Sequence, residues 1–255
     1  MLQRFREMLR QRSRREEVYS GATFWNDKAT THSGTAVSMF VNHALNERYQ
    51  HEQFAFFDKS LGDVAGRRVL DVGCGTGRLS RHLAEQGATV FAFDFAQKAI
   101  DIARRESEGM SIEYRVASVF DVDMGGDDYD DIVEIACLSA ACRTSEEFEA
   151  VLRKLHGALR PGGKLVLIEP FHRGFLHRVL RLSKAEAIAV MKTAGFEVFA
   201  TRELHFWPLR LWLTLGETPV WITRMLYPVG ETLLRLSPKR FGFGDYKGIA
   251  ARRLS

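Results

Sequence analysis

The chain has 255 residues, 45% of them hydrophobic, and a formal net charge of +4. This length and composition suit one hydrophobic core with additions better than two independent domains. No uncharged apolar run approaches the roughly 20 residues that a membrane-spanning helix needs, so we expect no membrane span. The three cysteines show no metal-ligand spacing, and their odd number, with no signal peptide, argues against a disulfide framework and for a reducing, cytoplasmic compartment.

The first fifteen residues hold most of the excess positive charge, with six arginines and one glutamate in MLQRFREMLRQRSRR. Their apolar side chains fall on one helical face, which describes either a short basic amphipathic helix on an anionic membrane surface or a solvated arm. Residues 18–60 are rich in aromatic, histidine and methionine side chains and are expected to form helices over a cleft. We therefore predict a helical cap at residues 1–60 and a core at 61–255.

From Arg67 onward, apolar β-rich runs alternate with helical patterns, which predicts a parallel sheet with helices on both faces. Capping signals at Thr144 with Glu147, and at Ser183 with Glu186, predict two helix starts, the second helix ending at Gly195. The expected strands cover residues 67–72, 89–94, 111–116, 131–136, 164–169, 196–204 and 246–253.

An apolar stretch at about residues 205–243 separates the last two expected strands, where a tight hairpin would have sufficed. Its charges fall at every seventh position, which on helices gives a narrow polar stripe. Four helix breakers are expected to divide it into short helices: Gly216, Pro219, Pro228 and Gly230. The apolar faces would form a lid over an apolar substrate, meet a membrane interface, contact a partner subunit, or pack against the sheet edge.

The stretch VLDVGCGTG at residues 69–77 places three glycines between the first strand and the next helix. The chain backbone can then approach a ligand closely at the carboxyl end of the strand. Dinucleotide-binding folds use G-x-G-x-x-G, whereas this loop reads G-x-G-x-G, which disfavours a nicotinamide-dependent dehydrogenase. Asp71 stands just before the loop, where a carboxylate suits an ammonium group better than a phosphate.

These residues resemble the first motif of the class I S-adenosylmethionine-dependent methyltransferases, and the resemblance extends over about residues 66–203 and resumes at the last strand. Asp94 stands where the family places an acidic residue on the ribose hydroxyls, and LRPGGKLVLIEP looks like the family's turn and fifth strand. The resemblance implies a doubly wound, seven-stranded, mostly parallel α/β sheet of the Rossmann-like type, with S-adenosyl-L-methionine as cofactor. The implied cofactor-binding residues are Asp71, Gly73, Cys74, Gly75, Gly77, Asp94, Phe95, Ser118, Val119 and Ala136.

One position departs from the family pattern. Many relatives carry an aspartate after the third strand that accepts a hydrogen bond from the adenine amino group, whereas this chain has Ser118. A hydroxyl is a weaker acceptor than a carboxylate. The departure makes a non-catalytic cofactor-binding module an alternative to an enzyme.

The expected acceptor is a small lipophilic molecule, such as a lipid, quinone precursor, isoprenoid or polyketide. The box after the fourth strand that is typical of adenine and glutamine methylation is missing, and the basic charge lies in the N-terminal arm rather than spread over the core. RNA and protein remain alternative substrates. We expect a cytoplasmic monomer or homodimer, with a peripheral position at the inner membrane as the alternative.

A hydroxyl acceptor calls for a general base, whereas an amine near neutral pH needs none. The predicted catalytic residues are His172 past the fifth strand, Glu134 near the end of the fourth, and His32 from the cap. Glu169 and His43 are further candidate bases, and Tyr19, His32 and His43 are the candidates to face the pocket. No metal-binding constellation stands out, so we expect metal-independent chemistry.

Overall fold

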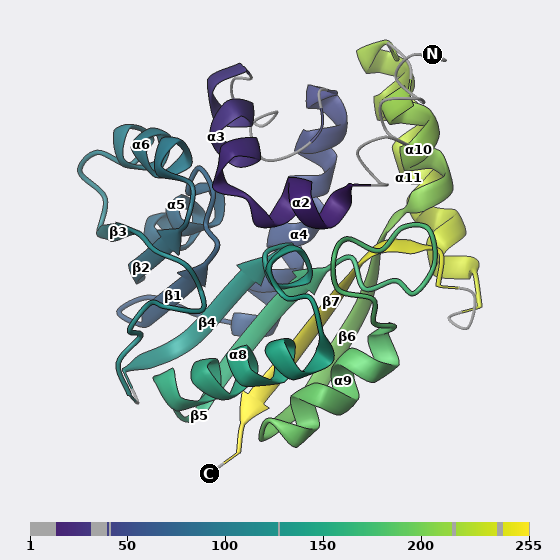
Figure 1. The fold of residues 1–255 in the computed structure, drawn as a ribbon. Coiled ribbons are helices and arrows are strands. Elements are labelled where there is room, and N and C mark those ends of the chain that lie inside the picture. The colour runs from purple at the N-terminus through teal and green to yellow at the C-terminus, as the bar shows by residue number, and fades with distance from the viewer. Residues whose placement is uncertain are drawn as a thin grey trace.

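The computed structural model describes residues 14–31, 40, 42–126, 128–215, 218–238 and 242–254. Within these residues, seven strands form one sheet in the order β3-β2-β1-β4-β5-β7-β6 (Figure 1). β1 to β5 run parallel, and β7 runs antiparallel to both of its neighbours. The strands are β1 Arg68–Val72, β2 Thr89–Asp94, β3 Ile112–Val116, β4 Tyr129–Ile135, β5 Leu159–Glu169, β6 Phe196–Phe206 and β7 Gly244–Arg253. The predicted seven-stranded, mostly parallel sheet is confirmed.

Helices cover both faces of this sheet and the end at which its parallel strands terminate. They are α2 Arg15–Ser20, α3 Ala22–Thr31, α4 His43–Leu61, α5 Arg78–Glu85, α6 Gln97–Glu106, α7 Leu138–Ala141, α8 Ser145–Ala158, α9 Lys184–Thr193, α10 Trp207–Leu215 and α11 Val220–Leu236. In Figure 1, α2 and α3 lie above the carboxyl ends of the central strands, and α10 and α11 stand beside β6.

Period-two alternation along the strands divides the apolar side chains between two core layers. Leu70 and Val72 face the layer that α8 and α9 cover, whereas Val69 faces the layer covered by α4, α5 and α6. Phe56 and Phe57 of α4 are buried in the second layer. Because both faces are buried, the strands read as nearly continuous apolar runs.

The predicted helix boundaries hold where a capping side chain marks them. The Thr144 hydroxyl accepts from the Glu147 amide, and Ser183 and Glu186 form a reciprocal capping box. The helix that begins there ends before Gly195, whose φ of +93° an L side chain rarely adopts.

The insertion contains fewer breaks than predicted. Pro228 and Gly230 do not end a helix, because α11 continues through both to Leu236. A Cβ on Gly230 would lie 2.7 Å from Leu209 Cδ2, so the glycine lets α10 pack closely against α11. Burial of Thr223, Tyr227 and Leu234 holds the helix together despite the amide that proline lacks. None of the helices described has both the length and the hydrophobicity that crossing a bilayer requires.

Candidate functional site

The glycine loop follows β1 in a tight left-handed path. Gly73 and Gly77 have φ of +67° and +74°. A Cβ on Gly73 would lie 2.4 Å from Cys137 Sγ, and one on Gly77 would lie 2.2 Å from the Tyr114 hydroxyl oxygen. Both positions therefore require glycine for conformation and for space. The Cys74 amide donates to the Phe93 carbonyl at 3.0 Å, which joins the loop to β2.

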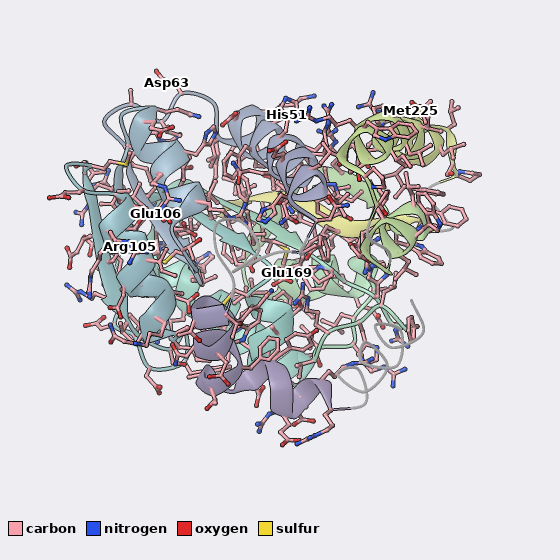
Figure 2. The ribbon with its side chains drawn as sticks, turned by 90° about the horizontal axis from the view of Figure 1, so that it is seen from above. His51, Asp63, Arg105, Glu106, Glu169 and Met225 are labelled. Atoms are coloured by element: carbon pink, nitrogen blue, oxygen red, sulfur yellow. The ribbon has the colours of Figure 1, made fainter. Side chains whose placement is uncertain are left out.

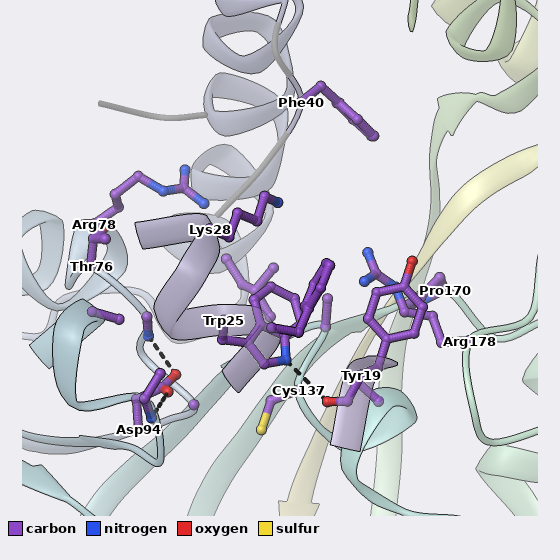
Figure 3. Close-up of a pocket in the computed structure, with 18 of the residues that line it drawn as sticks. Tyr19, Trp25, Lys28, Phe40, Thr76, Arg78, Asp94, Cys137, Pro170 and Arg178 are labelled. Atoms are coloured by element: carbon purple, nitrogen blue, oxygen red, sulfur yellow. Dashed lines mark hydrogen bonds between the residues drawn. The ribbon is translucent and has the colours of Figure 1, made fainter. Parts of the chain in front are cut away.

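Asp94 holds this loop from the end of β2. Its Oδ2 accepts from the Gly75 amide at 2.9 Å and its Oδ1 accepts from the Ala96 amide at 2.8 Å (Figure 3). Burial raises the pKa of Asp94, and the hydrogen bonds from these amides oppose that rise. Each carboxylate oxygen has a second lone pair, so the side chain can still accept from the ribose hydroxyls of a nucleoside.

Asp71 lies under the loop at the end of β1. Its Oδ2 accepts a hydrogen bond from the Ser80 hydroxyl at 2.6 Å. Burial raises the pKa of Asp71 to about 7, while the Ser80 hydrogen bond acts in the opposite direction. A cation bound beside this carboxylate would favour its ionised form.

A cavity of about 1480 Å³ opens above the loop. Its walls come from the glycine loop, the ends of β2 and β4, the helices α2 and α3, the segment after β5, and α10. Typical small-molecule pockets enclose about 300 to 1,000 Å³. The cavity therefore has room for a nucleoside cofactor and a second molecule beside it.

Most of the predicted cofactor residues meet in this cavity. The described residues of its lining include Asp71, Gly73, Cys74, Gly75, Asp94, Phe95, Ser118, Val119 and Ala136. Gly77 is outside the lining; it stands before α5 and faces Tyr114. Ala136 has φ of +57°, a strained conformation for an alanine and one that often marks a functional site. The Ser118 Oγ accepts from the Phe120 amide at 3.2 Å and can still donate to a ligand.

The predicted catalytic bases that the structure describes do not line the cavity. Glu134 and Glu169 are fully buried below the cavity, and Glu134 accepts from the amides of Cys137 and Leu138. Burial and the neighbouring Glu169 carboxylate raise the pKa of Glu134 well above its ordinary value. The His172 Nε2 donates to the Asp245 carbonyl at 2.9 Å. Glu134 and His172 are not among the described residues that line the cavity, and His32 falls outside the described part of the chain. Their catalytic roles stay predictions.

The lining also contains residues that sequence reasoning missed. Lys28 and Trp25 come from α3, Arg78 begins α5, and Arg178 and His177 come from the segment after β5. Tyr19 and His43, which were candidates for the pocket, do line it. The described residues contain no group of three or more His, Cys, Asp or Glu side chains that could hold a metal ion.

Polar contacts hold the α2 and α3 segment in position over the cavity. The Trp25 indole nitrogen donates to the Tyr19 carbonyl at 3.0 Å, and the Asn26 side chain accepts from the Lys98 amide at 3.0 Å. Glu16 pairs with Arg143 at 3.1 Å. The two helices therefore form a roof over the cavity.

Comparisons with known proteins agree with this geometry. A family model described as a methyltransferase domain matches residues 69–163. The chain is 32% identical over 183 residues to the ubiquinone biosynthesis O-methyltransferase of Xanthomonas euvesicatoria pv. vesicatoria (strain 85-10), a match that covers 69% of this chain and 73% of that protein. A protein of the same name from Rhizobium leguminosarum bv. trifolii (strain WSM2304) is 30% identical over 156 residues, covering 60% of this chain and 57% of that protein.

Solved structures share the fold at lower identity. The magnesium protoporphyrin IX methyltransferase (ChlM) of Synechocystis PCC 6803 with bound SAH has a TM-score of 0.60 and 17% identity, and the match covers 95% of this chain and 99% of that chain. An S-adenosylmethionine-dependent methyltransferase from Mesorhizobium loti has a TM-score of 0.59 and 20% identity, covering 79% of this chain and 97% of that chain.

The fold and the site define a Rossmann-like enzyme with a nucleoside-binding glycine loop. The chain belongs to the class I S-adenosylmethionine-dependent methyltransferases, which confirms the predicted enzyme class and cofactor.

Cofactor affinity is expected to depend on pH through Asp71. With a pKa of about 7 in the free protein, this carboxyl is partly protonated at acidic pH, and a bound cation lowers its pKa. Binding then releases a proton below pH 7, so affinity for S-adenosylhomocysteine rises with pH and levels off above about 7. Isothermal titration calorimetry between pH 5 and pH 8 measures this dependence. Release of one proton changes the affinity by at most about tenfold per pH unit.

The Asp71→Asn variant cannot ionise and is expected to lose the pH dependence. If affinity changes equally with pH in the wild type and in this variant, the proton released on binding comes from another group, such as Asp94, whose pKa is also raised by burial.

Proposed function

We propose that this enzyme transfers a methyl group to a hydroxyl oxygen of a small acceptor with an apolar body. The observation that carries the proposal is the wall of the cavity beyond the glycine loop, which is largely aromatic and aliphatic. Its apolar members include Tyr19, Phe24, Trp25, Phe40, Leu213 and Val220. Relatives named for O-methylation in ubiquinone biosynthesis support both the oxygen and the apolar body.

S-adenosylmethionine, when bound, supplies a methyl group already activated on a sulfonium. The protein therefore contributes mainly position and the exclusion of water. The glycine loop and Asp94 fix one side of the site, while α2 and α3 close it from above. The aromatic side chains of the roof hold the acceptor's apolar body against the strand ends.

A hydroxyl acceptor must lose its proton, and a positioned base contributes about 10² to 10⁴ in rate. Glu134, His172 and His32 remain candidates, and His43 and His177 join them because both line the cavity. The His177 Nδ1 donates to the Gly174 carbonyl at 2.7 Å, and its Nε2 accepts from Arg15 Nη1, a hydrogen bond that must open before Nε2 can take a proton from the acceptor. Comparing the pH profiles of kcat for single variants of these residues identifies the base.

The proposed function is tested with S-adenosylmethionine labelled on its methyl group, incubated with purified protein and host lysate. The lysate is then separated into organic-extractable, polar, protein and nucleic-acid fractions. We expect label in the organic fraction, lost with Asp94→Ala and retained with Asp101→Ala. Label in protein or nucleic acid would support a macromolecular substrate instead. Tight binding of S-adenosylhomocysteine with no label in any fraction would support a non-catalytic binding module.

We further propose that the acceptor is reached at an anionic membrane surface through α11. Exposed apolar side chains follow one face of this helix, including Trp221 at 65% exposure, Met225 and Leu236 at 78%. Figure 2 shows Met225 on the outer edge of the molecule, with Glu169 in its interior. Arg224 and Arg235 are exposed on α11, whereas its acidic residue, Glu231, is buried. Val220 is half exposed and also lines the cavity, so the apolar face reaches the cavity wall.

The exposed apolar face of α11 is expected to bind phospholipid vesicles. The variant Trp221→Ser/Met225→Ser/Leu236→Ser should lower the fraction that sediments with anionic phospholipid vesicles by about tenfold, because inserted apolar surface is lost. Phe199→Ser, an exposed apolar side chain on β6, is the matched control and should sediment like the wild type. Equal sedimentation of the triple variant and the wild type would remove the membrane from the proposal. Comparing sedimentation of the wild type with neutral and with anionic vesicles measures how much Arg224 and Arg235 contribute to membrane binding.

A further inference from the structure

Tyr246 brings a hydroxyl group to the cavity from the last strand. β7 runs antiparallel to β5, with Lys247 opposite Glu169, so Tyr246 lies at the edge where the parallel strands end. The side chain lines the cavity and is only 7% exposed. It therefore belongs to the cavity wall rather than to the outer surface of the protein.

Ring contacts fix the direction of this side chain. The Tyr246 ring meets the Tyr49 ring edge-on, with centroids 6.2 Å apart, and the His205 ring edge-on at 5.9 Å. Edge-to-face pairs of this kind stabilise one arrangement of the rings. The Tyr246 hydroxyl is therefore held at one place in the cavity wall.

The hydroxyl of Tyr246 accepts one hydrogen bond and has a proton left to donate. The Arg178 Nη2 donates to its oxygen at 2.9 Å, and no residue in the described part of the chain accepts the hydroxyl proton. The neighbouring Asp245 carboxylate accepts from Arg210 and Tyr49 instead. A buried donor without an acceptor costs about 1 to 3 kcal/mol, so this proton calls for a partner from the cavity.

Arg178 orients the hydroxyl so that its proton points away from the guanidinium. This guanidinium lies 5.3 Å from the centre of the Tyr19 ring, and Figure 3 shows the two side chains next to each other beside Pro170. Burial lowers the pKa of the guanidinium, but neighbouring groups, among them Tyr246 and the Glu169 carboxylate, raise it by more. Arg178 therefore stays charged and makes the hydroxyl a stronger donor, because hydrogen bonds in a chain polarise one another.

Charges around this hydroxyl are balanced. Arg178 interacts with the buried Glu169 carboxylate. Arg210 pairs with Asp245 at 2.8 Å. Further carboxylates of the cavity lining are those of Asp27 and Glu147. An anionic ligand would meet carboxylates as well as cations, so the observations favour an uncharged oxygen as the partner of the hydroxyl proton.

We propose that the methyl acceptor carries, besides the hydroxyl that is methylated, an uncharged carbonyl or ether oxygen that accepts a hydrogen bond from Tyr246, with Arg178 as the positioning residue. This inference rests on the proposed small-molecule acceptor and adds the polar group by which the acceptor is oriented. The apolar body packs against the aromatic wall, and a single buried donor fixes its orientation. A hydrocarbon of the same shape would leave the Tyr246 proton unpaired.

The test uses three phenols that share the same ring hydroxyl: p-butylphenol, methyl p-hydroxyphenylacetate and p-hydroxyphenylacetate. The ester has nearly the shape of the butyl compound but presents an uncharged carbonyl, and the acid presents a carboxylate. Their binding to the full-length protein is measured by isothermal titration calorimetry with saturating S-adenosylhomocysteine, so that no methyl transfer takes place. We expect the wild type to bind the ester about tenfold more tightly than the acid, because the anion would lose its hydration beside carboxylates.

The variant Tyr246→Phe removes only the hydroxyl. It is expected to weaken binding of the ester about three- to tenfold, the contribution of one hydrogen bond, and to leave binding of p-butylphenol and S-adenosylhomocysteine unchanged. Tyr227→Phe is the matched control, because it removes a buried hydroxyl, paired with His205, that is not in the described lining of the cavity. The control should bind all of these ligands like the wild type.

The variant Arg178→Met tests the positioning role. Without the guanidinium the Tyr246 hydroxyl is free to turn, so binding of the ester is expected to weaken about threefold while p-butylphenol keeps its wild-type affinity. Adding Arg178→Met to Tyr246→Phe should cause no further loss, because Arg178 acts through the hydroxyl. A variant that merely distorts the cavity wall would weaken both phenols alike.

Two outcomes would overturn the inference. If Tyr246→Phe changes the affinities for the ester and p-butylphenol equally, or changes neither, the hydroxyl does not meet an oxygen of the acceptor. Tighter binding of the acid than of the ester by the wild type would assign the site to an anion. Additive losses in the double variant would remove Arg178 from the proposal as a positioning residue.

The same measurements separate this inference from the proposed function. If the ester and p-butylphenol bind the wild type and Tyr246→Phe affects them equally, the small apolar acceptor stands and the oxygen contact does not. If neither binds while S-adenosylhomocysteine does, the small-molecule acceptor fails, and the inference that rests on it fails as well.

Discussion

The Asp94→Ala variant is expected to bind S-adenosylhomocysteine at least about 100-fold more weakly than the wild type. The substitution removes acceptors for the Gly75 and Ala96 amides, at 2.9 Å and 2.8 Å, and leaves both amides in a cavity wall. The variant also removes the acceptor for the two ribose hydroxyls, and each hydrogen bond to a charged group contributes about 1.5 to 3 kcal/mol, so the loss of two exceeds the roughly 2.7 kcal/mol of a 100-fold change in affinity. Isothermal titration calorimetry measures the affinity.

Asp101→Ala is the matched control, because Asp101 lies on the neighbouring helix α6 and its side chain is exposed. It should bind S-adenosylhomocysteine like the wild type. Asp94→Asn keeps one accepting oxygen and is expected to fall between the two. A folded Asp94→Ala protein with wild-type affinity would show that the carboxylate neither shapes the loop nor meets the cofactor.

The Gly73→Ala variant is expected to lose about 3 kcal/mol of folding free energy. An alanine there adopts a left-handed conformation, which costs about 1 to 2 kcal/mol, and its Cβ overlaps Cys137, which costs about 1 to 3 kcal/mol. For a chain of this length the melting temperature falls by roughly 10 °C. Differential scanning calorimetry measures the change, and cofactor binding should be lost with it.

Gly109→Ala separates the two contributions. Gly109 has φ of +80°, and a Cβ there would have no heavy atom within 4 Å. This variant should therefore show the conformational cost alone, about 1 to 2 kcal/mol. If Gly73→Ala is no less stable than Gly109→Ala, the overlap with Cys137 is relieved at little cost by a shift of the α7 segment.

The fold was predictable because its signals are local. Period-two apolar runs, the capping pair Ser183 and Glu186, and Gly195 each act within a few residues. The continuity of α11 was not predictable in this way. Pro228 and Gly230 are breakers by local rules, and only the contact with Leu209 and the burial of Tyr227 make them compatible with one helix.

One part of the candidate site was likewise predictable from local sequence, and the other part was not. The glycine loop and Asp94 lie within about a strand and a helix of each other in sequence, and a short motif identifies them. Lys28 and Arg178 are far apart in the chain and have no pattern that distinguishes them from other surface cations. They line one cavity because α3 lies over the strand ends and because the segment after β5 lies on the other side of the cavity, where Arg178 contacts Tyr19 of α2 (Figure 3). The acceptor side of the cavity is thus a property of tertiary structure.

The position of β7 has a consequence for biosynthesis. This strand is the last to leave the ribosome, yet it is inserted between β5 and β6. Until it emerges, both of those strands carry an open row of backbone donors and acceptors, and open strand edges are sites of aggregation. The interval between the emergence of β6 and that of β7 is therefore the stage of synthesis at which these two edges are most exposed to aggregation.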